Sequence, residues 1–212
     1  MTPSSETWSV CLSVAMAAAM ISIQLPTRLL RELDIPRPSW AWYCGYLITA
    51  LATTQIAYSS LSIPTVVIAG AVGLLISASV AIAWYDASFL IIPDVLPIML
   101  VIAALCLNFA AERQLSLLTA VLCAGLLASL MWGWRKATGK EAMGLGDVKL
   151  AGAFGLMLSP QQGAWMLAAS ALSAAAWTII IQKLHPKSTQ PLIPYGLFLA
   201  IIGCGMVLAI HP

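Results

Sequence analysis

The segment Pro64–Trp84, PTVVIAGAVGLLISASVAIAW, decides the fold class because it contains no charged side chain. A run of about 20 apolar residues is long enough to cross the hydrocarbon core of a bilayer as a helix. The whole chain of 212 residues is 61% hydrophobic and only 8% charged. Soluble domains carry about 25% charged residues, so this chain has too little charge to cover a water-facing surface. Lipid is therefore expected to be its main solvent.

Similar apolar runs recur along the chain, at Thr7–Leu25, Trp40–Ser60, Pro93–Asn108, Leu115–Trp134, Val148–Leu158, Ala164–Ile181 and Pro194–Ile210. Val148–Leu158 is the shortest of these runs. Backbone amides in lipid must be hydrogen-bonded within a helix or a closed barrel, and the runs are too long and uniform for barrel strands. The sequence predicts an all-α fold, a polytopic membrane helix bundle with about eight transmembrane helices. No linker or repeat divides it, which predicts a single transmembrane domain over residues 1–212.

The basic residues predict the orientation of this bundle. Arginine and lysine collect on the cytoplasmic loops of membrane proteins. In the eight-helix arrangement nine of the ten basic residues fall on one side, and only Arg113 falls on the other. We therefore expect both ends of the chain to lie outside the cytoplasm. The basic residues form no dense stripe with interleaved aromatic residues, so no nucleic-acid partner is expected, and membrane lipid is the simpler partner.

The five cysteines indicate neither a metal site nor a disulfide framework. They are scattered inside apolar runs, and no Cys-x-x-Cys pair occurs. Small apolar packing residues are the better interpretation. No metal and no cofactor is predicted.

Three aspartates need an explanation because charged groups at membrane depth are costly and usually face water or a partner. Asp86 ends the third run, Asp94 opens the fourth, and Asp147 precedes the sixth. Between Asp86 and Asp147 the chain crosses the membrane twice, so both return to the cytoplasmic side and are able to meet. Aspartate is also a favoured helix N-cap, which is the preferred interpretation of Asp94 and remains open for Asp147.

Two carboxyl groups held close together form an acid–base pair, because both cannot easily ionise and one keeps its proton. The ionised member activates a water molecule and the protonated member donates to a carbonyl oxygen, as amide hydrolysis requires. No Gly-x-Ser-x-Gly or His-Glu-x-x-His motif offers another nucleophile or metal. From the residues alone, a catalytic pair, a proton-conducting transporter and a non-catalytic assembly subunit of a pilus or secretion machine all remain possible.

Three motifs resemble those of the type IV prepilin peptidases, which are GxGD-type intramembrane aspartyl proteases. Glu141–Leu150, EAMGLGDVKL, is similar to the family signature around its GxGD sequence. Asp86–Asp94, DASFLIIPD, resembles the other catalytic segment of the family, and Ile193–Gly196, IPYG, resembles its Pro-Phe-Gly segment. Three motifs in this order, with the eight-helix arrangement, cover most of the chain.

The resemblance implies that Asp86 and Asp147 are catalytic. It assigns supporting roles to other motif residues, namely Gly144, Gly146, Asp94, Lys149, Pro194 and Gly196. It further implies an endopeptidase of the bacterial inner membrane that removes the basic leader of prepilins or pseudopilins at the cytoplasmic face. The substrate's apolar helix would stay in the bilayer as the protein partner. The sequence leaves the oligomeric state open.

One feature departs from the family pattern. Many members carry a large first cytoplasmic loop with paired Cys-x-x-Cys motifs, which is associated with methylation of the new pilin N-terminus. Here that loop is shortened to residues 26–39 and contains no cysteine. The chain therefore resembles the short, peptidase-only form, and N-methyltransferase activity is not expected.

Overall fold

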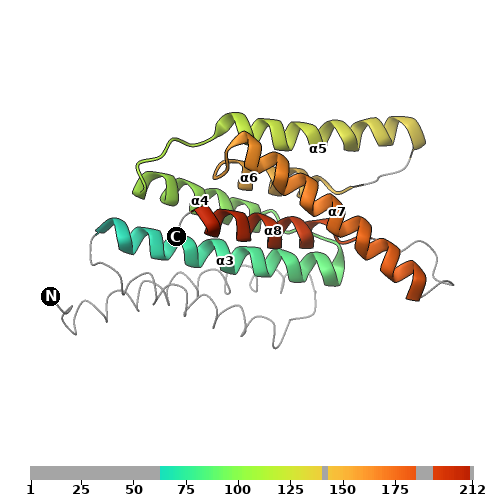
Figure 1. The fold of residues 1–212 in the computed structure, drawn as a ribbon, viewed down its shortest axis with the longest axis horizontal. Coiled ribbons are helices and arrows are strands. Elements are labelled where there is room, and N and C mark those ends of the chain that lie inside the picture. The colour runs from blue at the N-terminus through green and yellow to red at the C-terminus, as the bar shows by residue number, and fades with distance from the viewer. Residues whose placement is uncertain (1–62, 140–142, 185–192, 211–212) are drawn as a thin grey trace. The chain divides into compact units, whose positions relative to one another are not determined.

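The computed structural model describes residues 63–139, 143–184 and 193–210, and this part of the chain is helical (Figure 1). The described helices are α3 (Ile63–Phe89), α4 (Val95–Ala110), α5 (Leu117–Thr138), α6 (Leu145–Gly155), α7 (Pro160–Leu184) and α8 (Tyr195–Ile210). The described residues contain no strand, which confirms the all-α prediction for them. The runs at 7–25 and 40–60 and the loop at 26–39 lie outside the described residues, so the number of eight helices stays a prediction.

Each predicted apolar run in the described residues corresponds to one helix, but the boundaries differ. The third helix continues past Trp84 to Phe89, so Asp86 lies inside α3 rather than at its end. The sixth helix begins at Leu145, because Gly144, in an extended conformation, occupies the N-cap position. By length and composition, three segments in the described residues could cross a membrane: Gly70–Phe89, Leu117–Thr138 and Pro160–Leu184.

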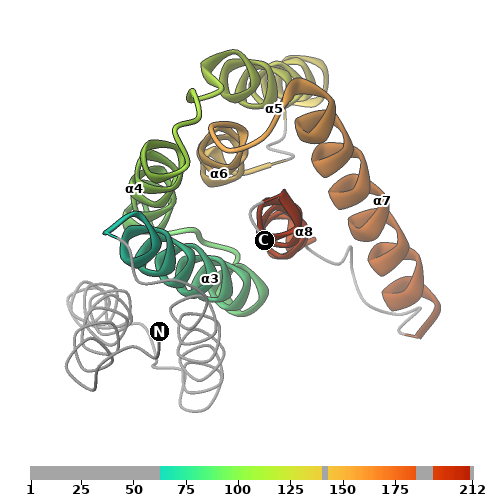
Figure 2. The same ribbon diagram turned by 60° about the vertical axis from the view of Figure 1, so that its left-hand side comes forward.

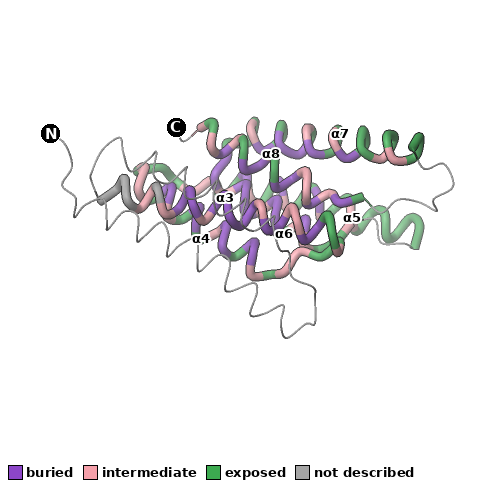
Figure 3. The backbone as a smooth tube through the Cα atoms, turned by 90° about the horizontal axis from the view of Figure 1, so that it is seen from below, coloured by how far each residue is buried: buried purple, intermediate pink, exposed green. Residues whose placement is uncertain are grey.

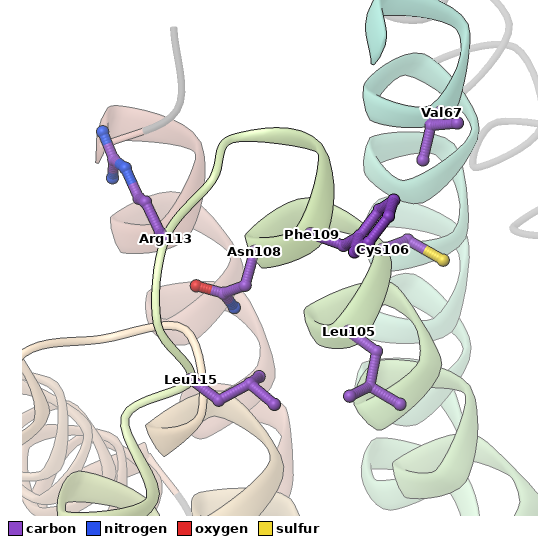
Figure 4. Close-up of a pocket in the computed structure, with 7 residues that line it drawn as sticks. All are labelled: Val67, Leu105, Cys106, Asn108, Phe109, Arg113 and Leu115. Carbon is purple, nitrogen blue, oxygen red and sulfur yellow. The ribbon is translucent and has the colours of Figure 1, made fainter. Parts of the chain in front are cut away.

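Contacts along the chain define two compact units, and the single-domain prediction remains a prediction. The first unit comprises Met1–Ala81 and Ile98–Leu115, and the second comprises Ile82–Pro97 and Ser116–Pro212. The first contains a pocket of about 550 Å³ beside the end of α4 (Figure 4). Its lining residues are Val67, Leu105, Cys106, Asn108, Phe109, Arg113 and Leu115. None of the predicted site residues lines this pocket; all of them lie in the second unit.

In the second unit, the short helix α6 packs against α5, α7 and α8, and Figure 2 shows it beside α5 and α8. Two close contacts define its position. A Cβ atom on Gly155 would lie 2.7 Å from the Cα of Ala120 on α5, and one on Gly203 of α8 would lie 2.8 Å from the ring of Phe154. The absence of side chains at these two glycines therefore lets α5 and α8 approach α6 closely.

The outer helices expose apolar side chains, as expected for contact with lipid. In the most apolar stretch of each helix, only 17% of α5 and 22% of α7 is buried within the chain, whereas 61% of α3 is buried. The C-terminal ends of α5 and α7 are exposed in Figure 3. Two buried hydroxyl groups are satisfied inside their own helices: those of Ser79 and Ser170 donate hydrogen bonds to carbonyls one turn earlier. This is the arrangement that helices in lipid require.

Candidate active site

Asp86 lies in the last turn of α3, with its side chain buried at 5% exposure. The helix ends three residues later. Leu90 follows with a left-handed φ of 56°, and its N–H donates to the carbonyl oxygen of Asp86 at 3.0 Å. A left-handed residue of this kind is a common way to end a helix, although glycine is usual there. The turn sends the chain back along the non-helical residues 90–94 into α4.

Asp147 lies in the first turn of α6 and is also buried, at 7% exposure. Because Gly144 holds the N-cap position, Asp147 is the third residue of the helix and not its N-cap. Asp147 therefore does not take the N-cap position that the sequence left open for it. Its Oδ1 atom is buried and has no hydrogen-bond partner among the described residues. A buried polar atom without a partner is rare and costly, so it needs a functional or solvent-related explanation.

The two carboxyl groups meet at the N-terminus of α8. The N–H of Leu197 donates a hydrogen bond of 2.8 Å to Oδ2 of Asp86. A Cβ atom on Gly196 would lie 3.0 Å from Oδ1 of Asp147 and 3.1 Å from Cγ of Asp86. Because both atoms lie so close to this one position, Oδ1 of Asp147 and Cγ of Asp86 are at most about 6 Å apart. Residues 61 positions apart in the chain are brought to one place by three helix ends.

The glycines of the predicted motifs leave room for this meeting. A Cβ on Gly146 would lie 2.9 Å from Cβ of Ile92, and one on Gly196 would lie 2.6 Å from Cδ1 of the same residue. Gly144 is at the N-cap of α6, with its own Cβ position 3.8 Å from Oδ2 of Asp147. Pro194 is buried just before α8 begins. Gly144 and Gly196 thus border the carboxyl groups, and Gly146 faces Ile92.

Asp94 and Lys149 lie at the rim of this arrangement. Nζ of Lys149 donates to Oδ1 of Asp94 at 2.6 Å, and the two side chains are 41% and 70% exposed. This ion pair joins the residue before α4 to the first half of α6. The sequence favours a helix-capping role for Asp94, the residue directly before α4, and a supporting role for Lys149 in ordering the loop or facing lipid phosphates. The structure shows these two side chains in contact with each other, and both are far more exposed than the buried carboxyl groups of Asp86 and Asp147.

Two features of the site were not predicted from the sequence. One is the backbone N–H of Leu197, which no side-chain motif indicates. The other is Ile92, which lies inside a recognised motif but has no polar group to attract notice. Within the described ranges, no three His, Cys, Asp or Glu side chains gather as metal ligands. This observation covers only the described residues, so the absence of a metal stays a prediction.

Comparisons with known proteins agree with the motifs. Residues 73–179 match the model of the type IV leader peptidase family. Three similar proteins are each named prepilin leader peptidase/N-methyltransferase. Those of Pectobacterium carotovorum subsp. carotovorum, Dickeya chrysanthemi and Aeromonas hydrophila are 31%, 30% and 30% identical, over 82%, 82% and 80% of this chain. The alignments span 69%, 68% and 64% of the lengths of those proteins. No solved structure matches the chain.

Proposed function

The chain belongs to the type IV leader peptidase family, and on that premise we propose that it is an intramembrane aspartic endopeptidase that cleaves the basic leader from type IV prepilins or pseudopilins. Membership confirms the resemblance and the class of enzyme predicted from the sequence. The similar proteins are named as prepilin leader peptidases, which supports prepilins as the substrate class here. The observation that carries the proposal is the pair of buried carboxyl groups, Asp86 and Asp147, beside Gly196.

The surroundings of the two carboxyl groups favour different protonation states. Asp86 accepts a hydrogen bond from the first turn of α8, where the N–H groups and the helix dipole stabilise negative charge. Asp147 also lies in the first turn of a helix, but its Oδ1 is buried without a partner, and this burial disfavours a charge on that carboxyl group. In the proposed mechanism Asp86 is therefore the carboxylate, and Asp147 is the carboxylic acid.

The reaction then follows from this pair. The Asp86 carboxylate takes a proton from a water molecule, whose oxygen attacks the carbonyl carbon of the scissile peptide bond. Asp147 gives its proton to the carbonyl oxygen, forming a gem-diol. When the carbon–nitrogen bond breaks, Asp86 returns its proton to the amine and one gem-diol hydroxyl reprotonates Asp147. The new carboxyl and amino termini leave, and both aspartates are restored to their starting states.

The membrane arrangement is part of the proposal. We place about eight transmembrane helices in the bacterial inner membrane, with the aspartates on the cytoplasmic side that the basic residues indicate. The apolar helix of the substrate would pack laterally against the exposed apolar faces of the bundle while its basic leader reaches the inner surface. The loop at 26–39 lacks cysteine, so we propose peptidase activity without N-methyltransferase activity.

Co-expression with a type IV prepilin tests the proposal. Asp86→Asn and Asp147→Asn should each abolish leader removal, seen on a gel, while the amount of protein in the membrane is unchanged. Asp94→Asn is the matched control, because it makes the same chemical change at an exposed ion pair and should retain processing. Normal processing by both asparagine variants at 86 and 147 would exclude the mechanism. A proton-conducting transporter or an assembly subunit predicts no cleavage by the unaltered protein.

A further inference from the structure

Ile92 contacts the elements that carry the two carboxyl groups. It belongs to the non-helical residues 90–94 that follow the helix of Asp86. On one side its Cβ is 2.9 Å from the position that a Cβ on Gly146 would take, directly beside Asp147. On the other its Cδ1 is 2.6 Å from the corresponding position on Gly196, beside the N–H that binds Asp86. One apolar side chain thus separates the first turns of α6 and α8.

The terminal methyl group of Ile92 is also close to the carboxyl groups themselves. The Gly196 position lies 3.0 Å from Oδ1 of Asp147 and 3.1 Å from Cγ of Asp86, so Cδ1 of Ile92 is within about 6 Å of both. Ile92 is half-buried and carries no group able to transfer a proton. It can therefore act on the chemistry only indirectly, through its effect on neighbouring groups.

We propose that Ile92 is a positioning residue that sets the spacing between the Asp86 and Asp147 carboxyl groups, by filling the gap between Gly146 and Gly196. The inference rests on the proposed function. Closely packed side chains transmit small displacements, because an interior without voids cannot absorb them. Displacing a reacting group by about 1 Å costs up to about a hundredfold in rate. Gly146 and Gly196 leave room for this side chain, since a Cβ atom at either position would clash with Ile92.

Three substitutions separate this role from general packing. Ile92→Val removes Cδ1 and leaves Cβ, so it takes away the contact at Gly196 while keeping the one at Gly146. Gly196→Ala adds an atom 2.6 Å from that Cδ1, whereas Gly146→Ala adds one 2.9 Å from Cβ, which valine retains. Ile92→Val should therefore rescue Gly196→Ala in part, because the added atom also lies 3.0 Å from Oδ1 of Asp147 and 3.1 Å from Cγ of Asp86. It should fail to rescue Gly146→Ala. The two double variants are matched controls for each other.

The measurement is steady-state cleavage of a purified prepilin in detergent micelles, with thermal unfolding followed for every variant. We expect Ile92→Val to lower kcat about tenfold and to leave KM within about twofold, because positioning affects the transition state more than binding. Gly196→Ala alone should lose about a hundredfold in kcat, and the double variant with Ile92→Val should recover at least about tenfold of that loss. Gly146→Ala should stay equally impaired with either residue at position 92.

Two results would overturn the inference: a kcat for Ile92→Val equal to that of the unaltered enzyme, or rescue of both glycine variants or of neither. Ile92→Val is a conservative change that keeps the fold, so its kcat remains measurable whatever happens to the glycine variants. Cleavage by the unaltered enzyme is measured in the same series. Failure there would reject the proposed function, whereas failure confined to the variants at position 92 would reject only the positioning role.

Discussion

Replacing Gly155 by alanine tests how closely α6 must approach α5 to hold Asp147 in place. The added Cβ would lie 2.7 Å from Cα and 2.9 Å from N of Ala120, and 3.0 Å from the carbonyl oxygen of Thr119. These are backbone atoms that no side-chain rotation can remove. Ordinary carbon contacts are about 3.5–4.0 Å, so the helices must separate by about 1 Å. Overpacking of this kind costs about 1–3 kcal/mol of unfolding free energy.

Gly152→Ala is the matched control on the same helix, three residues earlier. There the new Cβ would lie 3.4 Å from Cβ of Ala124, which is close to ordinary contact. Alanine is favoured over glycine inside a helix by about 1 kcal/mol, so Gly152→Ala should be neutral or stabilising. The two variants make the same chemical change on the same helix, but only Gly155→Ala brings the new atom against the backbone of α5.

The assay combines thermal unfolding in detergent with prepilin cleavage. Gly155→Ala should lower Tm by about 2–4 °C for each kcal/mol lost, and it should reduce cleavage by up to about a hundredfold through displacement of Asp147. Gly152→Ala should match the unaltered protein in both measurements. If Gly155→Ala proved as stable and as active as Gly152→Ala, the close packing of α6 on α5 could not be what positions the site.

Two further changes have expected outcomes. Glu112 follows α4 with a left-handed φ of 51°, a conformation that costs a residue with a side chain about 1–2 kcal/mol. Glu112→Gly should therefore raise the unfolding free energy by about 1 kcal/mol, and a lower Tm would contradict this. Asp94→Ala and Lys149→Ala break an ion pair with both partners substantially exposed, so each should cost less than about 1 kcal/mol and keep cleavage within about threefold. A loss as complete as that of Asp147→Asn would show that the pair belongs to the catalytic machinery.

The sequence allowed the helical fold of the described residues to be predicted, but the helix boundaries were less accurate. The sequence predicts that Asp86 ends a helix, yet α3 continues to Phe89 and the Asp86 carboxyl is buried within its last turn. The run at 148–158 is the shortest of the predicted helices. It forms α6 because packing against α5, α7 and α8 supports it. Contacts with other helices decide such a case, and hydrophobicity alone does not.

The catalytic role of Asp86 and Asp147 remains a prediction that the proposed experiments test. The sequence provided candidates because it repeats motifs of a family whose members match the chain. It did not reveal the N–H of Leu197 or the position of Ile92. Neither can be recognised from a sequence pattern, because a backbone amide is present at almost every residue and isoleucine is common in apolar runs.

The sequence by itself determined that this chain is helical and built for lipid, because its shortage of charge and its long apolar runs are local properties. It also determined which carboxyl groups stand out, since acids are rare in such a background. Only the tertiary structure decided that Asp86 and Asp147 lie together beside Gly196, with unequal hydrogen bonding. That outcome depends on where three helix ends meet, and the meeting is set by packing between residues distant in the chain.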